Sequence, residues 1–190
     1  MWIGLWSAAT DPGDLTGEIA GGLGAVVVGH ERNMGYGASL RSLFTEALGL
    51  GADVVVTLDG DGQHDPAEIP RLVERLEAGD VDIVIGSRFL EGGGSEAPGW
   101  RRAGIRLITG LASNDRLRLT DAQSGFRAYN RRALESLVLT EEGMGVSTEI
   151  LLKAEENGLR VAVEWGYPAA SKSKFLIDCC TSGSTIYMVY

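Results

Sequence analysis

The sequence predicts an α/β fold with a mostly parallel sheet flanked by helices, and three observations lead to this fold class. Short apolar runs recur along the chain, at residues 2–6, 25–28, 53–58, 81–85 and 159–165. Segments with apolar residues at helical spacing lie between several of them, at 39–48, 66–76 and 148–157. The run at 53–58 is continuous rather than alternating, which is typical of a strand covered on both faces. Strands that alternate with helices in this way form largely parallel sheets.

The first half of the chain contains the clearest elements. After the strands expected at 2–6 and 25–28, the helix expected at 39–48 carries its apolar residues on one face: Leu40, Leu43, Phe44, Ala47 and Leu48. The strand at 53–58 then ends in an acidic turn. Asp65 is well placed to cap the following helix, and Pro66 to begin it. The buried face of that helix is expected to contain Ile69, Leu72, Val73 and Leu76, and Gly79 is expected to end it.

The second half repeats the alternation. The strand at 81–85 runs into Gly86, Ser87 and Arg88, and a glycine-rich loop suited to a lid follows at 89–100. A helix at 148–157 is followed by Gly158, a residue type that favours helix ends, and then by the strand at 159–165. Ligands of such sheets bind at the carboxyl ends of the strands. The acidic turn and Arg88 are therefore predicted to lie at one edge of the sheet.

Composition narrows the class of protein. A chain of 190 residues fits one domain, or a domain with a small appendage. The formal net charge of −9 argues against nucleic acid as a non-specific partner. The two cysteines, Cys179 and Cys180, are adjacent and have no other partner, which favours a reduced, cytoplasmic setting. No run approaches the roughly 18 apolar residues of a membrane-spanning helix, so any work at a membrane is expected at its surface.

The turn after the strand at 53–58 is the strongest candidate site. Asp59 and Asp61 flank Gly60, and Gln63 adds an amide oxygen two residues later. Mg²⁺ or Mn²⁺ takes such oxygen ligands and completes its shell with water and substrate phosphates. A calcium-binding EF-hand is the competing interpretation, but a strand stands where its first helix belongs, and Pro70 stands where its last glutamate belongs. An ordinary turn explains Asp65 well and the two aspartates at 59 and 61 poorly.

Arginines follow at the predicted edge of the sheet. Arg88 could hold phosphate oxygens through its planar guanidinium group. Arg101, Arg102 and Arg106 lie in a basic amphipathic segment at 100–111, which would suit a phosphate-bearing lipid. For any one of these arginines alone, a solvated helix face is the better explanation. As a set in an acidic protein they point to an anionic ligand.

Two further segments carry weaker signals. Residues 121–127 (DAQSGFR) combine a carboxylate, an amide, a hydroxyl, a glycine and an arginine before a helix. Such a loop could position an acceptor or offer N–H groups to an anion, and an ordinary turn explains it equally well. Residues 33–37 (NMGYG) place two glycines ahead of a helix, a weak phosphate-loop signal without the ending of a P-loop.

Taken together, these motifs resemble the inverting family 2 glycosyltransferases. The segments VVVTLDGDGQHDPAEIP, DIVIGSRF, DAQSGFRAYNRRAL and STEI occur in the order and spacing of that family. The resemblance covers roughly residues 26–165, and it is greatest to the polyprenyl-phosphate (dolichyl-phosphate) mannose or glucose synthases, which act in protein glycosylation. It implies a GT-A fold, a Rossmann-like sheet that binds a nucleotide-sugar donor.

The resemblance also implies roles for individual residues. Asp59 and Asp61 match the DxD pair, and Asp61 and Gln63 would lie nearest the metal. Arg88, with Arg101 or Arg102, matches the arginines that meet the diphosphate and the lipid phosphate. The acceptor-side loop corresponds to Asp121, Gln123 and Ser124. The nucleophile of such an enzyme is a phosphate oxygen, which is already ionised at neutral pH and needs no strong base.

The sequence departs from the family at both ends. Members begin with a further strand, and their next strand ends in D-D-G-S-x-D, where this chain has WSAATD at 6–11. The first strand of the family lies inside the sheet, and its omission would leave two rows of unpaired backbone groups. We therefore expect this strand to be missing or replaced. Residues 171–190 match nothing in the family, so we expect a single catalytic domain at 1–168 and a divergent tail at 169–190.

Two hypotheses of different classes follow. The first is a metal-dependent enzyme that moves a hexose from GDP-mannose or UDP-glucose to a polyprenyl phosphate at the cytoplasmic membrane face. The second is a catalytically inactive GT-A-like module that binds a partner, or a second copy of itself, through an incomplete sheet. A nucleotidyltransferase would need a G-x-G-T-R signature, which the chain lacks. The sequence leaves the base, the sugar and the choice between Mg²⁺ and Mn²⁺ open.

Overall fold

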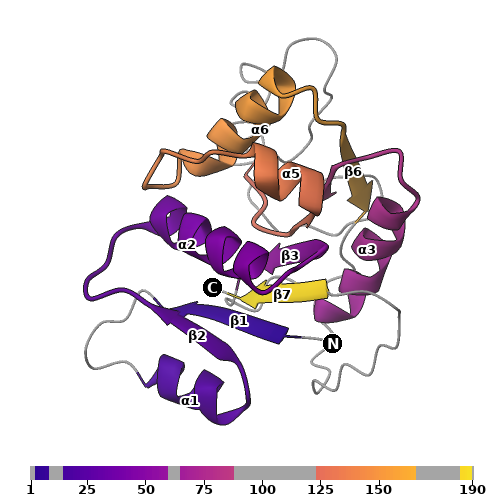
Figure 1. The fold of residues 1–190 in the computed structure, drawn as a ribbon. Helices are drawn as coiled ribbons and strands as arrows, with labels where there is room; N and C mark the ends of the chain where they lie inside the picture. The colour runs from indigo at the N-terminus through magenta and orange to yellow at the C-terminus, as the bar shows by residue number, and fades with distance from the viewer. Residues whose placement is uncertain (1–2, 9–14, 60–64, 88–122, 166–184, 190) are drawn as a thin grey trace, which may run out of the picture.

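A computed structural model of the chain describes residues 3–8, 15–59, 65–87, 123–165 and 185–189. The strands are β1 (Ile3–Ala8), β2 (Val26–Gly29), β3 (Val54–Leu58), β4 (Ile83–Ser87), β5 (Arg127–Asn130), β6 (Val161–Trp165) and β7 (Thr185–Val189). The helices are α1 (Thr16–Gly22), α2 (Tyr36–Gly49), the 3-10 turn η1 (Pro66–Glu68), α3 (Ile69–Glu77), α5 (Arg131–Ser136) and α6 (Val146–Glu156). Figure 1 shows the strands between these helices.

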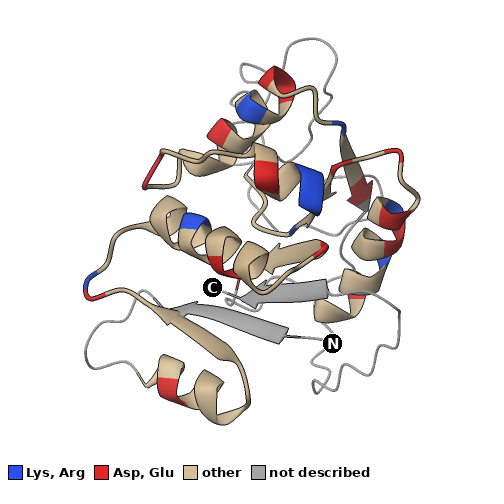
Figure 2. Ribbon diagram, viewed as in Figure 1, with Lys and Arg blue, Asp and Glu red and all other residues tan. Residues whose placement is uncertain are grey.

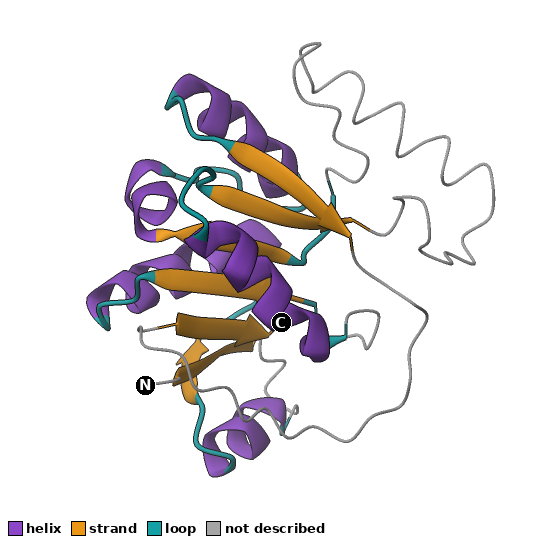
Figure 3. Ribbon diagram, turned by 90° about the vertical axis from the view of Figure 1, so that its right-hand side faces the viewer, coloured by secondary structure: helices purple, strands orange, loops and turns teal. Residues whose placement is uncertain are grey.

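All seven described strands form one sheet in the order β2-β1-β7-β3-β5-β4-β6. Every neighbouring pair is parallel except the two pairs that include β5, which runs against both β3 and β4. Figure 3 views the molecule after a quarter turn and shows helices packed around the stacked strands. The α/β class with a mostly parallel sheet is therefore confirmed.

The sheet at β3 is covered on both faces by apolar side chains, as the continuous run at 53–58 predicted. Val55 packs toward a cluster that includes apolar residues of α2, α5 and α6. Its neighbours Val54 and Val56 pack toward a second cluster that includes α3. The predicted face of α3 is confirmed in full, because Ile69, Leu72, Val73 and Leu76 are all buried. The predicted helix start is confirmed as well, because the Asp65 side chain accepts a hydrogen bond from the N–H of Ala67 (3.0 Å).

The position beside β3 that the sequence left open is filled by β7. Its residues pair in parallel with β1 on one side, from Ile3↔Ile186 to Trp6↔Val189. They pair in parallel with β3 on the other, from Val54↔Thr185 to Leu58↔Val189. Both rows of backbone groups that a missing strand would leave unpaired therefore have partners. We expected the family's first strand to be missing or replaced. The structure shows replacement: β7, from the segment expected to be a divergent tail, occupies that position.

This arrangement removes the premise of the partner-binding hypothesis. That hypothesis, and the suggestion of self-association, required an open position within the sheet. Among the described strands the sheet is continuous from β2 to β6, and only these two strands lie at its edges.

None of the described helices is long and apolar enough to cross a membrane.

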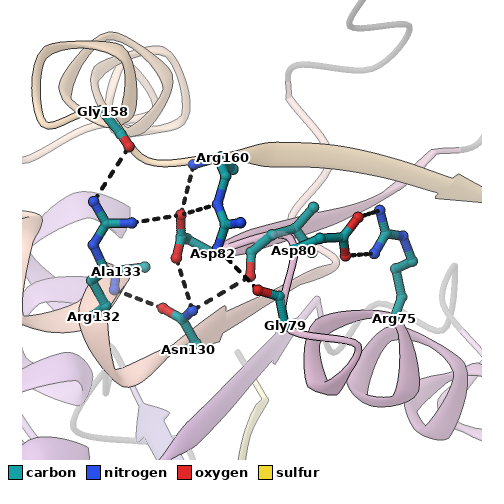
Figure 4. A network of polar contacts seen from close by, with 10 residues as sticks. Arg75, Gly79, Asp80, Asp82, Asn130, Arg132, Ala133, Gly158 and Arg160 are labelled. Carbon is teal, nitrogen blue, oxygen red and sulfur yellow. Dashed lines mark hydrogen bonds and ion pairs between the residues drawn. The ribbon is translucent and has the colours of Figure 1, made fainter.

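A buried carboxylate fastens the end of the sheet opposite the predicted site (Figure 4). Asp82 lies directly before β4, and its side chain is only 2% exposed. It accepts hydrogen bonds from the backbone N–H of Arg160 (2.8 Å), from Nδ2 of Asn130 (3.1 Å) and from Arg132 (3.1 Å). Burial alone would raise the pKa of Asp82, but these donors outweigh burial and hold the pKa below its ordinary value. The network joins β4, β5, α5 and β6.

Outside this network, acidic and basic residues are both found on the exposed surface. Figure 2 shows both signs of charge on α2, α3, α5 and α6. Several are paired at the surface, such as Arg131 with Glu135 along α5 (2.9 Å). Exposed pairs of this kind contribute little to stability. The ion pairs of Asp82 with Arg132 and Arg160 differ from these, because the Asp82 carboxylate is almost fully buried.

We expect Met188→Pro to lower the free energy of unfolding by at least about 2 kcal/mol, because proline removes an N–H from a strand bonded on both sides. Met188→Ala keeps that N–H and is the matched control. Guanidinium chloride denaturation of both variants would measure the difference. Equal stability of the two variants would contradict the interior position of β7.

We expect Asp82→Ala to cost about 2–3 kcal/mol of stability at neutral pH, because it removes the acceptor shared by donors of Asn130, Arg132 and Arg160. The pKa of Asp82 is lower in the folded state, so its contribution is complete above the unfolded value of about 3.9 and disappears as the pH falls through the folded value. Urea titrations between pH 2 and 7 would therefore show the variant and the wild type converging in acid. Asp80→Ala, which removes only an exposed ion pair with Arg75, should cost far less.

Candidate active site

The candidate site lies where β3, β4 and β5 meet. Because β3 and β4 are parallel and β5 runs between them in the opposite direction, the start of β5 lies at the carboxyl ends of the other two. The turn at 123–126 is thus placed beside Asp59, the first residue after β3. This is the edge of the sheet where ligands of such folds bind.

The turn is attached to β3 by a buried hydroxyl and by close packing. Thr57 Oγ1 donates to the carbonyl oxygen of Gly125 (2.6 Å). The carboxyl group of Asp59 lies directly against Gly125: a Cβ atom added there would stand 2.5 Å from Oδ2 and 2.6 Å from Cγ of Asp59, with Oδ1 closer still. Any side chain at position 125 would therefore compete with the Asp59 carboxylate for space.

The same turn is attached to β4 by Ser124. Its hydroxyl is buried and donates to the carbonyl oxygen of Gly86 (2.7 Å), while the N–H of Phe126 lies within hydrogen-bonding distance of the same hydroxyl (3.3 Å). The N–H of Gly86 donates to the carbonyl of Phe126 (2.8 Å), and a Cβ atom on Gly86 would meet the Phe126 ring. Ser124 thus has a structural partner, and its predicted acceptor-side role stays a prediction.

A buried arginine, Arg127, donates a hydrogen bond to the turn at 123–126. Arg127 is 2% exposed, and its Nε donates to the carbonyl oxygen of Ser124 (2.8 Å). Both terminal nitrogens reach the carbonyl of Ser147 in α6 (3.4 Å each). Arg127 was part of the motif at 121–127 but was not selected as a site residue, because sequence alone does not distinguish a buried arginine from a surface one.

Tyr36 completes the surroundings of Asp59. It is the first residue of α2, and its side chain is within electrostatic range of Asp59, Arg127 and Tyr129. Burial raises the pKa of the Tyr36 phenol above its ordinary value; Asp59 and Tyr129 raise it further, and Arg127 opposes the rise. The phenol therefore stays neutral at physiological pH. The weak signal at 33–37 was the only indication that this residue lies near the site.

The glycines at 33–37 serve close packing. Gly37 and Ala38 donate their N–H groups to the carbonyl of Glu142 (2.8 and 3.4 Å). A Cβ atom on Gly35 would collide with the carbonyl of Glu142, and one on Gly37 with that of Glu141; Gly35 also has φ of 90°, which favours glycine. Those two amides at the start of α2 are therefore bonded to protein, which argues against a phosphate cradle formed by them.

The loop that accepts these hydrogen bonds is held in place by Glu149 of α6. Its carboxylate accepts from the N–H and the hydroxyl of Thr140 (2.9 and 2.6 Å), from the N–H of Glu141 (3.0 Å) and from Lys153 (3.0 Å). Burial alone would raise the pKa of Glu149, but these donors lower it to about 2. Glu149 thereby fixes the loop that packs against Gly35 and Gly37, on either side of Tyr36 in the sequence.

The structure brings some of the predicted residues together and leaves others outside the described residues. Asp59 is partly exposed at the end of β3, Gln123 is exposed at the start of the turn, and Ser124 is buried within it. The predicted site residues outside the described part are Gly60, Asp61, Gln63, Arg88, Arg101, Arg102 and Asp121. Among the described residues no three acidic, histidine or cysteine side chains are grouped to hold a metal ion. A carboxylate at this edge, with further oxygen ligands two and four residues later, suits the ligand preferences of Mg²⁺ and Mn²⁺.

Comparison with known proteins decides the family. The sequence profile of "Glycosyl transferase family 2" matches residues 11–138, more than half of the chain. The chain belongs to glycosyl transferase family 2. The resemblance inferred from the motifs is thereby confirmed.

Relatives within family 2 include enzymes named for polyprenyl phosphates. The chain is 33% identical to polyprenol monophosphomannose synthase of Mycolicibacterium smegmatis, over 67% of this chain and 49% of the relative. It is 31% identical to dolichol-phosphate mannosyltransferase of Pyrococcus furiosus, over 85% of this chain and 44% of that one. The chain thus spans about half the length of these curated relatives.

Comparison with solved structures supports the fold. Glucosyl-3-phosphoglycerate synthase of Mycobacterium tuberculosis, in complex with Mn²⁺, UDP and phosphoglyceric acid, superposes with a TM-score of 0.63 at 19% identity. The match covers 86% of this chain and 68% of that structure. The expected GT-A fold is confirmed by this likeness.

We expect Glu149→Gln to destabilise the folded state and to flatten its pH dependence. In the wild type the folded pKa of about 2 lies below the unfolded value of about 4.3, so this stabilisation is complete above about pH 5 and is lost as the pH falls toward 2. Urea denaturation at pH 7, 5, 4 and 3 would measure it. Glu155→Gln, at an exposed position of the same helix, is the control and should retain the wild-type slope. Parallel slopes for all three proteins would contradict the role of Glu149.

Proposed function

We propose that this chain carries out inverting transfer of a hexose from a nucleotide-sugar, GDP-mannose or UDP-glucose, to a polyprenyl (dolichyl) phosphate. The observation that carries the proposal is the contact between Asp59, the first carboxylate of the DxD motif, and the turn at 123–126. The first belongs to the donor side and the second to the acceptor side in the family that the motifs resemble. The names of the relatives support the choice of a polyprenyl phosphate as acceptor.

On the donor side we assign Asp59, Asp61 and Gln63 to a divalent metal ion, Mg²⁺ or Mn²⁺. When bound, such an ion stabilises the negative charge of the departing nucleoside diphosphate. The Mn²⁺ and UDP in the complex of the structural relative support a metal of this class. Gly60 separates the two carboxylates in the sequence, and Arg88, Arg101 and Arg102 would add positive charge around the phosphates.

On the acceptor side the chemistry requires positioning rather than proton removal. A phosphate oxygen is already ionised at neutral pH, so the protein has to align it with the anomeric carbon and exclude water. We assign this alignment to the segment that contains Asp121, Gln123 and Ser124. The buried hydroxyl of Ser124 contributes by holding the turn to β4, while Gln123 is exposed and free to face a ligand at the edge of the sheet.

The proposed acceptor, a polyprenyl phosphate, determines where in the cell the protein is expected to act. Polyprenyl phosphates are membrane lipids, so the catalytic edge would have to approach a membrane surface. We place the protein at the cytoplasmic face as a peripheral protein, with the basic segment at 100–111 nearest the lipid phosphate. A nucleotide-sugar donor, which is made in the cytoplasm, is consistent with that side.

We expect Asp61→Ala to weaken metal-dependent nucleotide binding at least 10-fold while leaving the fold intact, because it removes an assigned metal ligand and no apolar core residue. Calorimetric titration of UDP-glucose and of GDP-mannose, each with Mn²⁺ and with EDTA, would measure this. Asp53→Ala, which removes an exposed carboxylate at the opposite end of β3, is the matched control and should bind like the wild type. The donor that binds would then be incubated with polyprenyl phosphate, and a glycolipid product is expected.

Two results would overturn these assignments. Equal binding by the wild type and by Asp61→Ala would contradict the metal site. Failure of the folded wild type to bind either donor would contradict the transferase proposal itself.

A further inference from the structure

We propose that Gly125 is a positioning residue for the Asp59 carboxylate, so that the acceptor-side turn sets the orientation of a donor-side metal ligand. This inference rests on the proposed function, because it concerns the metal that Asp59 is assigned to hold. It goes beyond that proposal by giving a role to a glycine of the 121–127 segment to which the motif analysis assigned none.

The packing at position 125 shows why glycine is needed there. The three nearest heavy atoms to an added Cβ all belong to the Asp59 carboxyl group, with Cγ at 2.6 Å. The backbone of Gly125 lies outside the left-handed region, so its conformation alone does not require glycine. The requirement comes from the carboxylate, which occupies the space where a side chain would stand.

The turn is rigid enough to act as a support. Both neighbours of Gly125 are buried, and its own carbonyl accepts from Thr57 Oγ1. Ser124 is bonded to β4 through its hydroxyl and to Arg127 through its carbonyl. Since each of these partners lies in a strand or at its end, the Cα of Gly125 cannot move away from β3 without breaking buried hydrogen bonds.

The carboxylate, in contrast, is the movable partner. It is the far end of a side chain that is partly exposed at the edge of the sheet. A methyl group at position 125 would therefore displace the carboxylate rather than the turn. A displacement of about 1 Å is enough to impair a metal ligand, because coordination distances vary by only about 0.2 Å.

Substitution of Gly125 by alanine tests the proposal. We expect Gly125→Ala to fold and to bind UDP or GDP in the presence of Mn²⁺ at least 10-fold more weakly than the wild type, with binding in EDTA unchanged. Gly49→Ala places its methyl group in open space at the end of α2 and is the matched control, expected to bind like the wild type. Titration calorimetry with both nucleotides would measure these affinities.

A thermal-unfolding cycle tests the contact independently of any ligand. Gly125→Ala should lower the unfolding midpoint by a few degrees in the wild type but not in an Asp59→Ala background, where the space is vacant. Equal shifts in both backgrounds would overturn the contact. Coupled shifts with unchanged Mn²⁺-dependent affinity would overturn the positioning role. If the wild type binds neither nucleotide, the proposed function fails, and the cycle still reports whether Gly125 and Asp59 pack together.

Discussion

The hydrogen bonds that fasten the turn at 123–126 to β3 and β4 are the interactions on which the site depends. β5 is antiparallel to both neighbours, so its first residues lie where β3 and β4 end. There Thr57 donates a hydrogen bond to the turn, and the carbonyl of Gly86 accepts one from it. A turn buried this deeply would be costly if its polar groups lacked partners. Here the serine hydroxyl and the carbonyls of Ser124 and Gly125 all have them. The edge of the sheet is thereby rigid before any ligand arrives.

The rigid edge of the sheet holds the Asp59 carboxylate close to buried polar side chains. Asp59 stands among a buried guanidinium group and a buried phenol, contributed by β5 and by the start of α2. The segment that carries Tyr36 packs in turn on a loop that Glu149 fixes from α6. Three elements far apart in the sequence therefore converge on one carboxylate. In the proposed metal-assisted transfer, this convergence would orient the carboxylate before the leaving group develops its charge.

The sequence predicted the elements whose apolar period is long and regular, namely α2, α3, α6 and the strands at 53–58 and 81–85. It did not predict β5, because RAYN has only four residues, including a buried arginine whose partners are remote carbonyls. It did not predict α1, which is short and weakly patterned, and it expected a helix after residues 121–127 without giving the bounds of α5. Within the site, Asp59 and the 121–127 segment were selected because their residue types carry chemistry. Arg127, Tyr36 and Gly125 were missed because their importance lies in contacts between distant segments.

The position of β7 also has a consequence for how the chain folds. This strand joins β2 and β1 to the remainder of the sheet, yet it comes from the far end of the described residues. Until it pairs, β1 and β3 each have an unpaired edge, and bringing together strands this far apart in the sequence carries an entropic cost that slows folding. A nascent chain would therefore pass through a state with two exposed edges, which is prone to pair with other chains.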